Sequence, residues 1–316
     1  MGHHFAEHML RHTSYDLIFL DRLDTSGNLN RIAEISDWDK NKTRCKWIWH
    51  DLRAPLSSQL IAQLGRVDMI IHLAAATHVD RSITDPLSFV YDNVVGTANL
   101  LEYARITQPD RFFYFSTDEV FGPAPEGVAY KEWDRYKSAN PYAASKAGAE
   151  ELCIAYQNTY KLPIIITHCM NIFGERQHPE KFIPNTIVKV RDGKKVQIHA
   201  NADRTKAGSR FYIHARNVAD GLLHLVPRGI PGEKYNIVGE REVDNLAMAQ
   251  FIAQVQGKEL HYEMLDFHSQ RPGHDLRYAL DGSRMAAMGW KPPVSFEASL
   301  ERTINWTLAH PRWLLQ

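Results

Sequence analysis

Two short segments of this chain carry five side chains that can transfer protons or polarise oxygen atoms. Thr117, Asp118 and Glu119 follow one another directly, and Tyr142 and Lys146 lie in the later stretch Tyr-Ala-Ala-Ser-Lys. Adjacent carboxyl groups can serve as an acid and a base when their environments push their pKa values apart. Alone, the acidic pair would indicate a helix N-terminus, and the tyrosine and lysine a helix surface. Together, the five residues predict a catalytic site.

The elements that must position these side chains follow from the apolar pattern. Residues 111–115 are mostly aromatic and typical of a buried strand, so residues 116–119 fall at its carboxyl end. A helix is predicted over 141–160. Open α/β sheets bind their ligands at the carboxyl ends of the strands. We therefore expect the five side chains to meet at one edge of a sheet.

Strand and helix patterns alternate through the first half of the chain, which predicts a doubly wound α/β fold with a parallel sheet. Beyond about residue 170 turn signals separate shorter periodic segments. We expect a smaller substrate-binding domain there, interleaved with the first. The predicted domains are 1–170 with 211–237 returning to it, and 171–210 with 238–316. The predicted strands are 17–20, 45–49, 69–73, 111–115 and 163–169, and the predicted helices are 3–12, 56–64, 86–105 and 141–160.

The composition excludes several classes of function. The 316 residues include 37 basic and 37 acidic ones, so no overall field attracts nucleic acid or a membrane surface. No apolar run is long enough to span a bilayer. Three widely spaced cysteines, without a C-x-x-C pair, indicate reduced thiols and a cytoplasmic location. His4, His8 and His12 could form a metal-binding helix face, but we expect solvated histidines and no metal site.

The start of the chain departs from a complete dinucleotide-binding fold. Such a fold opens with a strand and a Gly-rich turn that brings a pyrophosphate to a helix N-terminus. Here the predicted helix begins at once, and Gly2 is placed as the last glycine of that turn. Asp21 then ends the second strand, where an acid binds the adenosine ribose and disfavours a 2′-phosphate. We expect the first strand to lie upstream, with NAD preferred over NADP.

Several motifs give the chain a resemblance to a known family over nearly its whole length. The chain resembles the extended short-chain dehydrogenase/reductases, and within them the nucleotide-sugar 4,6-dehydratases of the dTDP-glucose type. The resemblance implies a Rossmann-like fold. Phe121 and Met170 stand where this family more usually has Tyr and Asn. The motifs are Ser116 to Gly122, Tyr142-x-x-x-Lys146, His72 to Ala75, Thr77 to Ser82, Asn93 to Thr97, Pro179 to Pro184, and Arg271 to Asp275.

The resemblance implies an activity and roles for the catalytic candidates. The expected reaction is NAD-dependent 4,6-dehydration of a nucleotide-diphosphate hexose, by C4 oxidation, C5/C6 water elimination and hydride return to C6. Tyr142 is the implied base for the C4 hydroxyl, and Lys146 supplies the cation that makes a phenol a better base. Thr117 hydrogen-bonds the C4 oxygen. Glu119 is the implied C5 base, and protonated Asp118 is the C6 acid.

The same resemblance assigns binding residues and a homodimer built from helices 86–105 and 141–160. The expected cofactor-binding residues are Gly2, Asp21, Asp51, Leu52, Ala74, Ala75, Asn93 and Ser116, together with Tyr142 and Lys146. The expected substrate-binding residues are Thr77, Asn171, Lys181, Arg210 and Arg271. Two alternatives stay open. A 4-epimerase or decarboxylase of this fold would share Tyr142 and Lys146, and a non-catalytic nucleotide-sugar-binding paralogue would fit the incomplete start.

Overall fold

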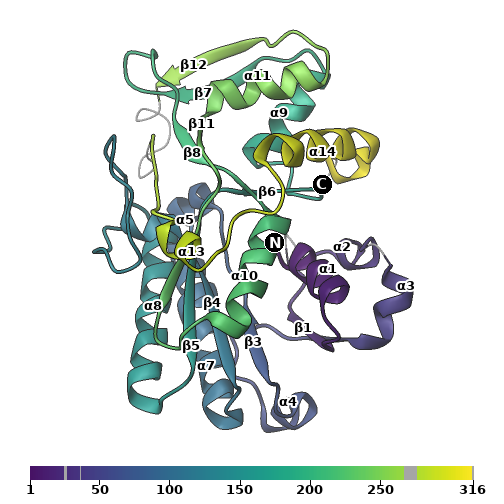
Figure 1. Ribbon diagram of the computed structural model, residues 1–316, viewed down its shortest axis with the longest axis vertical. Helices are drawn as coiled ribbons and strands as arrows, with labels where there is room; N and C mark the ends of the chain where they lie inside the picture. The colour runs from purple at the N-terminus through teal and green to yellow at the C-terminus, as the bar shows by residue number, and fades with distance from the viewer. Residues whose placement is uncertain (25–26, 36, 267–275, 315–316) are drawn as a thin grey trace.

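A four-stranded parallel sheet forms the centre of this computed structural model, which describes residues 1–24, 27–35, 37–266 and 276–314. Its strands lie in the order β10 (Lys234–Ile237), β5 (Ile164–Cys169), β4 (Arg111–Thr117) and β3 (Met69–His72) (Figure 1). The predicted α/β fold with a parallel sheet is therefore confirmed. Strand β4 runs to Thr117, two residues further than predicted, so the first catalytic candidate ends the strand itself.

Helices cover both faces of this sheet, because successive strand residues point to opposite sides. Phe112 and Tyr114 of β4 pack in a buried cluster with residues of α7 (Gly96–Thr107) and α8 (Pro141–Tyr160). Phe113 packs on the other side with residues of α1 (Gly2–His12) and α10 (Ala215–Arg228). The sheet between these layers is dry, so polar groups that it buries need partners.

A second, separate pair of parallel strands carries Asp21. Strand β1 (Leu17–Asp21) pairs with β2 (Cys45–Trp49), and within the described residues neither is hydrogen-bonded to β3. Both β1 and β3 nevertheless contribute partly buried side chains, such as Leu17 and Ile71, to the cluster beneath α1. Strand β1 also leaves Ile18 37% exposed, unlike the fully buried β5.

Two predictions about helices need correction. The predicted helix 86–105 is three helical segments: α6 (Pro86–Phe89), the π-helical turn η2 (Val90–Val95) and α7. The π turn holds buried Asn93, whose side-chain contacts take it out of a regular helix. The histidines of α1 are also not all solvated. His4 and His8 are buried, with their Nε2 atoms 3.0 Å from the Glu175 carbonyl oxygen and 3.6 Å from Asp220 Oδ2.

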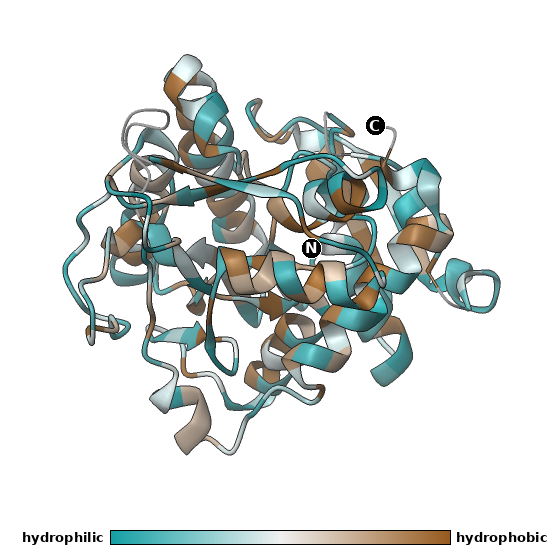
Figure 2. Cartoon of the chain, turned by 90° about the horizontal axis from the view of Figure 1, so that it is seen from above, coloured by the Kyte–Doolittle hydropathy of each residue, from teal (hydrophilic) through white to brown (hydrophobic). Residues whose placement is uncertain are grey.

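The second half of the chain is more regular than its sequence pattern suggested. A buried cluster lies between α9 (Phe182–Arg191), α11 (Asn245–Val255), α14 (Phe296–Ala309) and β7 (Val196–Ala200). In Figure 2 the helices carry both hydrophobic (brown) and hydrophilic (teal) stretches, whereas most peripheral loops are hydrophilic (teal). Strand β10 returns the chain to the central sheet. The domain limits themselves stay a prediction.

The remaining elements are short and connect these layers. Three two-stranded pairs, β12–β7, β11–β8 and β6–β9, lie outside the central sheet. None of the helices in the described part of the chain is long and apolar enough to cross a membrane. The short elements are α2 (Asn30–Ala33), α3 (Trp38–Asn41), η1 (Lys42–Arg44), α4 (Ser58–Leu64), α5 (Val79–Thr84), η3 (Asp118–Phe121), β6 (Ile172–Phe173), β8 (Ser209–Phe211), β9 (Ile213–His214), β11 (Glu242–Asp244), β12 (Tyr262–Asp266), α13 (Ser283–Ala287) and η4 (Pro311–Leu314).

Candidate active site

Strand β4 brings three of the predicted catalytic side chains to one point. Thr117 ends the strand and caps η3, and Asp118 and Glu119 are the first residues of that short helix. The Thr117 hydroxyl donates a hydrogen bond of 2.9 Å to Asp118 Oδ1 and accepts one of 3.4 Å from the Glu119 backbone N–H. Thr117 and Asp118 are buried, whereas Glu119 is half-buried. The strand end thus presents two carboxyl groups in different surroundings.

Helix α8 begins beside this strand end. Asn140 is its N-cap, with its side-chain oxygen accepting from the Ala143 N–H at 2.8 Å, and Pro141 is its first residue. The Asn140 side-chain amide also donates to Glu119 Oε2 at 3.0 Å. Asn140 was not predicted as a site residue. The Asn-Pro pair signals a helix start, but nothing in the sequence signals the contact with Glu119.

Asp118 has the surroundings of a carboxylic acid that keeps its proton. Burial, and then the negative charge of Glu119, raise the pKa of Asp118 to about 7, against opposing contributions from Thr117 and Arg210. Its Oδ2 atom is buried and has no hydrogen-bond partner among the described residues. A buried polar atom of this kind is costly unless a ligand or water pairs with it. The oxygen is therefore placed to bind or protonate a bound molecule.

Tyr142 and Lys146 lie one turn apart on α8, both buried. Burial and then the charge of Glu119 raise the pKa of Tyr142, and a hydrogen bond with Thr117 opposes them. Lys146 Nζ donates to the Phe115 carbonyl oxygen at 2.7 Å and lies 4.3 Å from the centre of the Tyr114 ring. Its recorded partners are on β4, so the expected lowering of the Tyr142 pKa by Lys146 is not seen in this structure. Burial lowers the pKa of Lys146 to about 8.

A buried carboxylate, Glu150, joins the strands and the helix behind these residues. It lies one turn after Lys146 and accepts hydrogen bonds from Ser116 of β4 and from Tyr136. His168 Nε2 of β5 lies 3.1 Å from Glu150 Oε2, and Lys234 Nζ of β10 lies 3.5 Å from the same oxygen. Burial would raise the pKa of Glu150, but its cationic and hydrogen-bonding partners outweigh this and hold it at about 2.

This cluster engages Ser116 and was missed by the sequence prediction. The Ser116 hydroxyl was expected to bind a cofactor, yet its recorded hydrogen bond goes to Glu150. His168 Nδ1 lies 3.0 Å from Asn236 Oδ1, so both ring nitrogens face acceptors. In the sequence, Glu150 stands out only as a charged residue within the predicted helix 141–160, one turn after Lys146.

Three of the predicted cofactor-binding residues lie around the ends of β1 and β2. Asp21 ends β1 and is exposed, with Oδ1 accepting a hydrogen bond of 2.7 Å from the backbone N–H of Leu23. Asp51 is held by Arg53 Nε at 2.8 Å, and hydrogen bonds from Arg53 are the main reason that its pKa falls to about 2. Leu52 packs its side chain against the cluster beneath α7 and α8. Asp51 and Leu52 thus have structural contacts of their own, whereas Asp21 faces solvent at the sheet edge.

Asn93 orders the turn that follows β3. Its side-chain oxygen accepts from the Ala76 N–H at 2.8 Å, and its amide donates to the Ala76 carbonyl oxygen at 3.1 Å and to Ser145 Oγ at 2.8 Å. These bonds tie the turn after Ala74 and Ala75 to α8. Asn93 therefore positions neighbouring backbone, and its own amide is fully engaged.

The predicted substrate-binding residues fall into two groups. Lys181 Nζ lies 3.5 Å from the Thr77 carbonyl oxygen, so these two residues meet across the fold. Arg210 donates to the carbonyl oxygens of Ser209 and Leu276, both at 2.6 Å, and its charge reaches Asp118. Asn171 is exposed. Arg271 lies outside the described residues. The structure thus joins Arg210 to the acidic pair.

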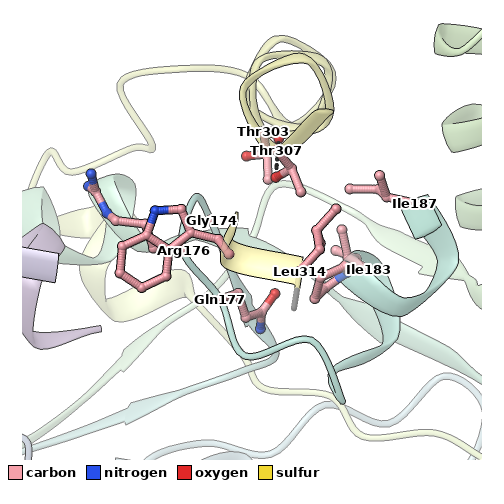
Figure 3. A pocket seen from close by; sticks show the side chains of 10 residues that line it. Gly174, Arg176, Gln177, Ile183, Ile187, Thr303, Thr307 and Leu314 are labelled. Atoms are coloured by element: carbon pink, nitrogen blue, oxygen red, sulfur yellow. Dashed lines mark hydrogen bonds between the residues drawn. The ribbon is translucent and has the colours of Figure 1, made fainter. Parts of the chain in front are cut away.

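A small hollow lies elsewhere, between the segment that follows β6, helix α9 and the C-terminal part of the chain (Figure 3). Isoleucine and threonine side chains of α9 and α14 make up much of its wall. None of the predicted catalytic or binding residues lines it, so it is not a candidate for the active site. Its lining residues are Gly174, Arg176, Gln177, Ile183, Pro184, Ile187, Thr303, Thr307, Trp313 and Leu314.

Comparison with known proteins identifies relatives over the full length of the chain. The family described as GDP-mannose 4,6 dehydratase matches residues 1–303. The dTDP-glucose 4,6-dehydratase of Escherichia coli is 35% identical over 341 aligned residues, which cover 99% of this chain and 92% of the relative.

Solved structures give the same picture. The dTDP-glucose 4,6-dehydratase of Streptomyces venezuelae, solved with NAD and the ligand TYD bound, has a TM-score of 0.88 and 32% identity, covering 99% of this chain and 95% of its own. A UDP-glucuronic acid 4-epimerase of Bacillus cereus has a TM-score of 0.86 at 22% identity, with 98% and 96% coverage. At that identity the likeness concerns the fold alone.

The Glu150 cluster predicts a large loss of stability when its charge is removed. Glu150→Gln should lower the free energy of unfolding by about 3–5 kcal/mol, because Lys234 would stay buried without its carboxylate. Urea denaturation followed by circular dichroism measures this change. The matched control is Glu151→Gln on the same helix, where the side chain is exposed and the expected change is within about 0.5 kcal/mol. Equal midpoints for the two variants would contradict the role given to Glu150.

Proposed function

We propose that this chain, which belongs to the GDP-mannose 4,6-dehydratase family, catalyses the NAD-dependent 4,6-dehydration of a nucleotide-diphosphate hexose of the dTDP-glucose or UDP-glucose type. The observation that carries this proposal is the pair Asp118 and Glu119 beside Tyr142. Asp118 has a pKa of about 7, and its buried Oδ2 atom has no hydrogen-bond partner among the described residues. Elimination of water needs an acid and a base on neighbouring carbons, and two carboxyl groups in unlike surroundings supply both. The chain is thus a hydro-lyase.

The residues present fit NAD as the bound cofactor. Asp21 offers an exposed carboxylate at the end of β1 for a ribose, and an added Cβ at Gly2, the first residue of α1, would meet no other atom within 4 Å. Lys146 offers a buried ammonium group at the catalytic end of α8. NAD⁺ supplies the hydride chemistry when bound, taking the C4 hydrogen and returning it to C6. Asp21, Gly2, Ala74, Ala75, Tyr142 and Lys146 are the residues proposed to hold it.

Tyr142 is the proposed base for the C4 hydroxyl. Thr117 is among the groups that lower the pKa of the phenol, so we place its hydroxyl beside the same C4 oxygen. Burial keeps the phenol protonated in this structure, and only the phenolate can accept the C4 proton. A cation beside the phenol would favour loss of its own proton to solvent and so form the phenolate. Lys146 is the nearby candidate on the same helix face, after a change of its partner from the Phe115 carbonyl oxygen.

Glu119 and Asp118 divide the elimination between them. Glu119 is half-buried and oriented by Asn140, which suits a carboxylate that removes the C5 proton. Asp118, with a pKa raised to about 7, keeps a proton in part of the molecules at neutral pH and is proposed to give it to the leaving C6 hydroxyl. The return of hydride to C6 then requires a proton at C5, which Glu119 carries. Arg210, Lys181, Arg271, Thr77 and Asn171 are proposed to bind the nucleotide diphosphate and sugar.

The alternatives are less well supported. A 4-epimerase or decarboxylase has no need for a protonated carboxyl group beside a second carboxylate, and the epimerase structures compared are 20–24% identical. A non-catalytic paralogue has no use for the raised pKa of Asp118, because a binding protein transfers no proton. A cytoplasmic location also stays a proposal. The three cysteines, all free thiols, support it.

Turnover of sugar nucleotides tests the proposal directly. Purified protein incubated with NAD⁺ and dTDP-glucose, or UDP-glucose, should form the 4-keto-6-deoxy sugar, detected by its ketone absorbance and by mass spectrometry as loss of one water. Glu119→Gln should retain C4 oxidation but lose exchange of the C5 hydrogen with solvent deuterium. A galactose-configured product of unchanged mass would support the epimerase instead. No turnover with either substrate would support the non-catalytic paralogue.

The raised pKa of Asp118 predicts how the elimination depends on pH. As the acid, Asp118 must carry a proton, which it keeps below about pH 7 and loses above it. The rate of water loss should therefore fall as the pH rises through 7, while C4 oxidation does not fall in the same range. Single-turnover kinetics across pH separate the two steps. Asp118→Asn should lower the elimination rate by about 10²–10⁴-fold and remove this decline. A decline that persists in the variant would assign it to another group.

We also propose a homodimer that uses the helical region 86–107 and helix α8. Three large apolar side chains near the start of the helical region 86–107 are exposed: Leu87 is 65% exposed, Tyr91 53% and Val90 42%. Exposed apolar patches of this kind commonly mark interfaces. Light scattering after gel filtration should give twice the chain mass of 36.2 kDa. Leu87→Asp should give the monomer mass, whereas Ile230→Asp, at a 59% exposed control position, should not. A monomeric wild-type protein would reject the proposal.

A further inference from the structure

Two histidines and a glutamate from different halves of the chain lie close together, next to the contact between Thr77 and Lys181. His78 is the N-cap of α5, and His178 and Glu180 shortly precede α9. Glu180 Oε2 lies 3.5 Å from His78 Nε2 and 3.8 Å from His178 Nδ1. One ligand atom from each residue can be chosen so that all three lie within 4.8 Å of one another. The two imidazole rings meet edge to face, with centres 5.8 Å apart.

This spacing is that of ligands around one metal ion. Zinc binds histidine nitrogen and carboxylate oxygen at about 2.0–2.2 Å, which places tetrahedral ligands about 3.4 Å apart. The two distances to Glu180 Oε2 are close to this value, and small side-chain rotations would close the third. Both histidines are half-buried, so their rings are partly held by their surroundings. His178 Nδ1 also lies 3.4 Å from the Glu180 backbone nitrogen.

The ligand set also selects the kind of ion. Two imidazoles and one carboxylate suit zinc, cobalt, nickel or copper, whereas magnesium and calcium prefer oxygen alone. A neutral imidazole keeps a lone pair on one ring nitrogen, and this lone pair binds such ions. Three protein ligands leave a fourth position for water or for an oxygen of another molecule.

One cation, Arg81, competes for the Glu180 carboxylate and limits the affinity. Arg81 donates to both Glu180 oxygens at 3.0 Å, but its side chain is 46% exposed and such surface pairs contribute little to stability. Lys181 is the next residue and adds positive charge. An incoming ion must displace Arg81 from Glu180 while His78 and His178 approach. The expected affinity is therefore micromolar rather than the far tighter binding of a structural zinc site.

We propose that His78, His178 and Glu180 form a binding site for a divalent transition-metal ion, which ties the start of α5 to the segment before α9. The site lies beside Thr77 and Lys181, because each is the chain neighbour of a ligand. An ion there would hold these two segments together and hinder exchange of the sugar nucleotide. The effect on turnover rests on the proposed function, but metal binding does not.

Metal binding can be measured without any catalytic assay. Zn²⁺ titrated into the purified full chain by calorimetry, and Co²⁺ followed by its visible absorption, should both report one site that His178→Asn weakens by at least about tenfold. His178→Cys should restore it, because a thiolate also binds these ions. His261→Asn changes an exposed histidine away from the site and should leave binding unchanged. Circular dichroism melts verify that each variant is folded.

The contrast between the variants decides the proposal. Zn²⁺ should also raise the melting temperature of the wild-type protein more than that of His178→Asn, because an ion that binds only the folded chain stabilises it. Equal Zn²⁺ affinity in the wild type, His178→Asn and Glu180→Gln would overturn the site. So would Co²⁺ spectra that show only water ligands. If binding is found but Zn²⁺ does not inhibit an active enzyme, the site stands and its placement beside the substrate is wrong.

Discussion

The buried carboxylate of Glu150 holds together the elements on which the candidate active site is built. It receives hydrogen bonds or charges from β4, β5, β10 and the segment before α8, while Glu150 itself belongs to the helix that carries Tyr142 and Lys146. A buried charge is costly unless its partners are complete. Since these partners come from three adjacent strands, the carboxylate is satisfied only when the strands and the helix are in register. The placement of the catalytic residues therefore depends on it.

A second constraint separates two carboxyl groups that follow one another in the chain. Asp118 is enclosed, whereas Glu119 is partly open and meets Asn140. Each negative charge disfavours the other, and the enclosed group takes the proton. The fold produces this asymmetry by ending β4 at Thr117 and turning at once into η3, which directs neighbouring side chains to unlike surroundings. The difference between an aspartate and a glutamate side chain would not by itself separate the pKa values of the two groups in this way.

Sequence patterns predicted those features that depend on local order. The aromatic run of β4 is a strong signal, and both β4 and α8 begin where expected. The contacts that Asn93 makes from the π turn were missed because they reach Ala76 and Ser145, in other segments. The partners of Glu150 were missed for the same reason. Ser116, His168 and Lys234 are ordinary strand residues until the sheet brings them together, and His4 is an ordinary helix residue until Glu175 covers it.

The separation of β1 and β2 from the central sheet has a consequence for how the molecule opens. In the described residues the main-chain groups along one edge of β1 and of β3 have no neighbouring strand, so side-chain packing links the two sheets, through Leu17 beneath α1 and through Leu20 on the side of α7 and α8. Strands joined by backbone hydrogen bonds separate only when these bonds break together, whereas elements joined by side-chain packing can open locally. The part that carries Asp21 can thus exchange its amide hydrogens through local openings that leave β4, β5 and α8 intact. Cofactor retention and the order of the catalytic residues would then be governed by two different local stabilities.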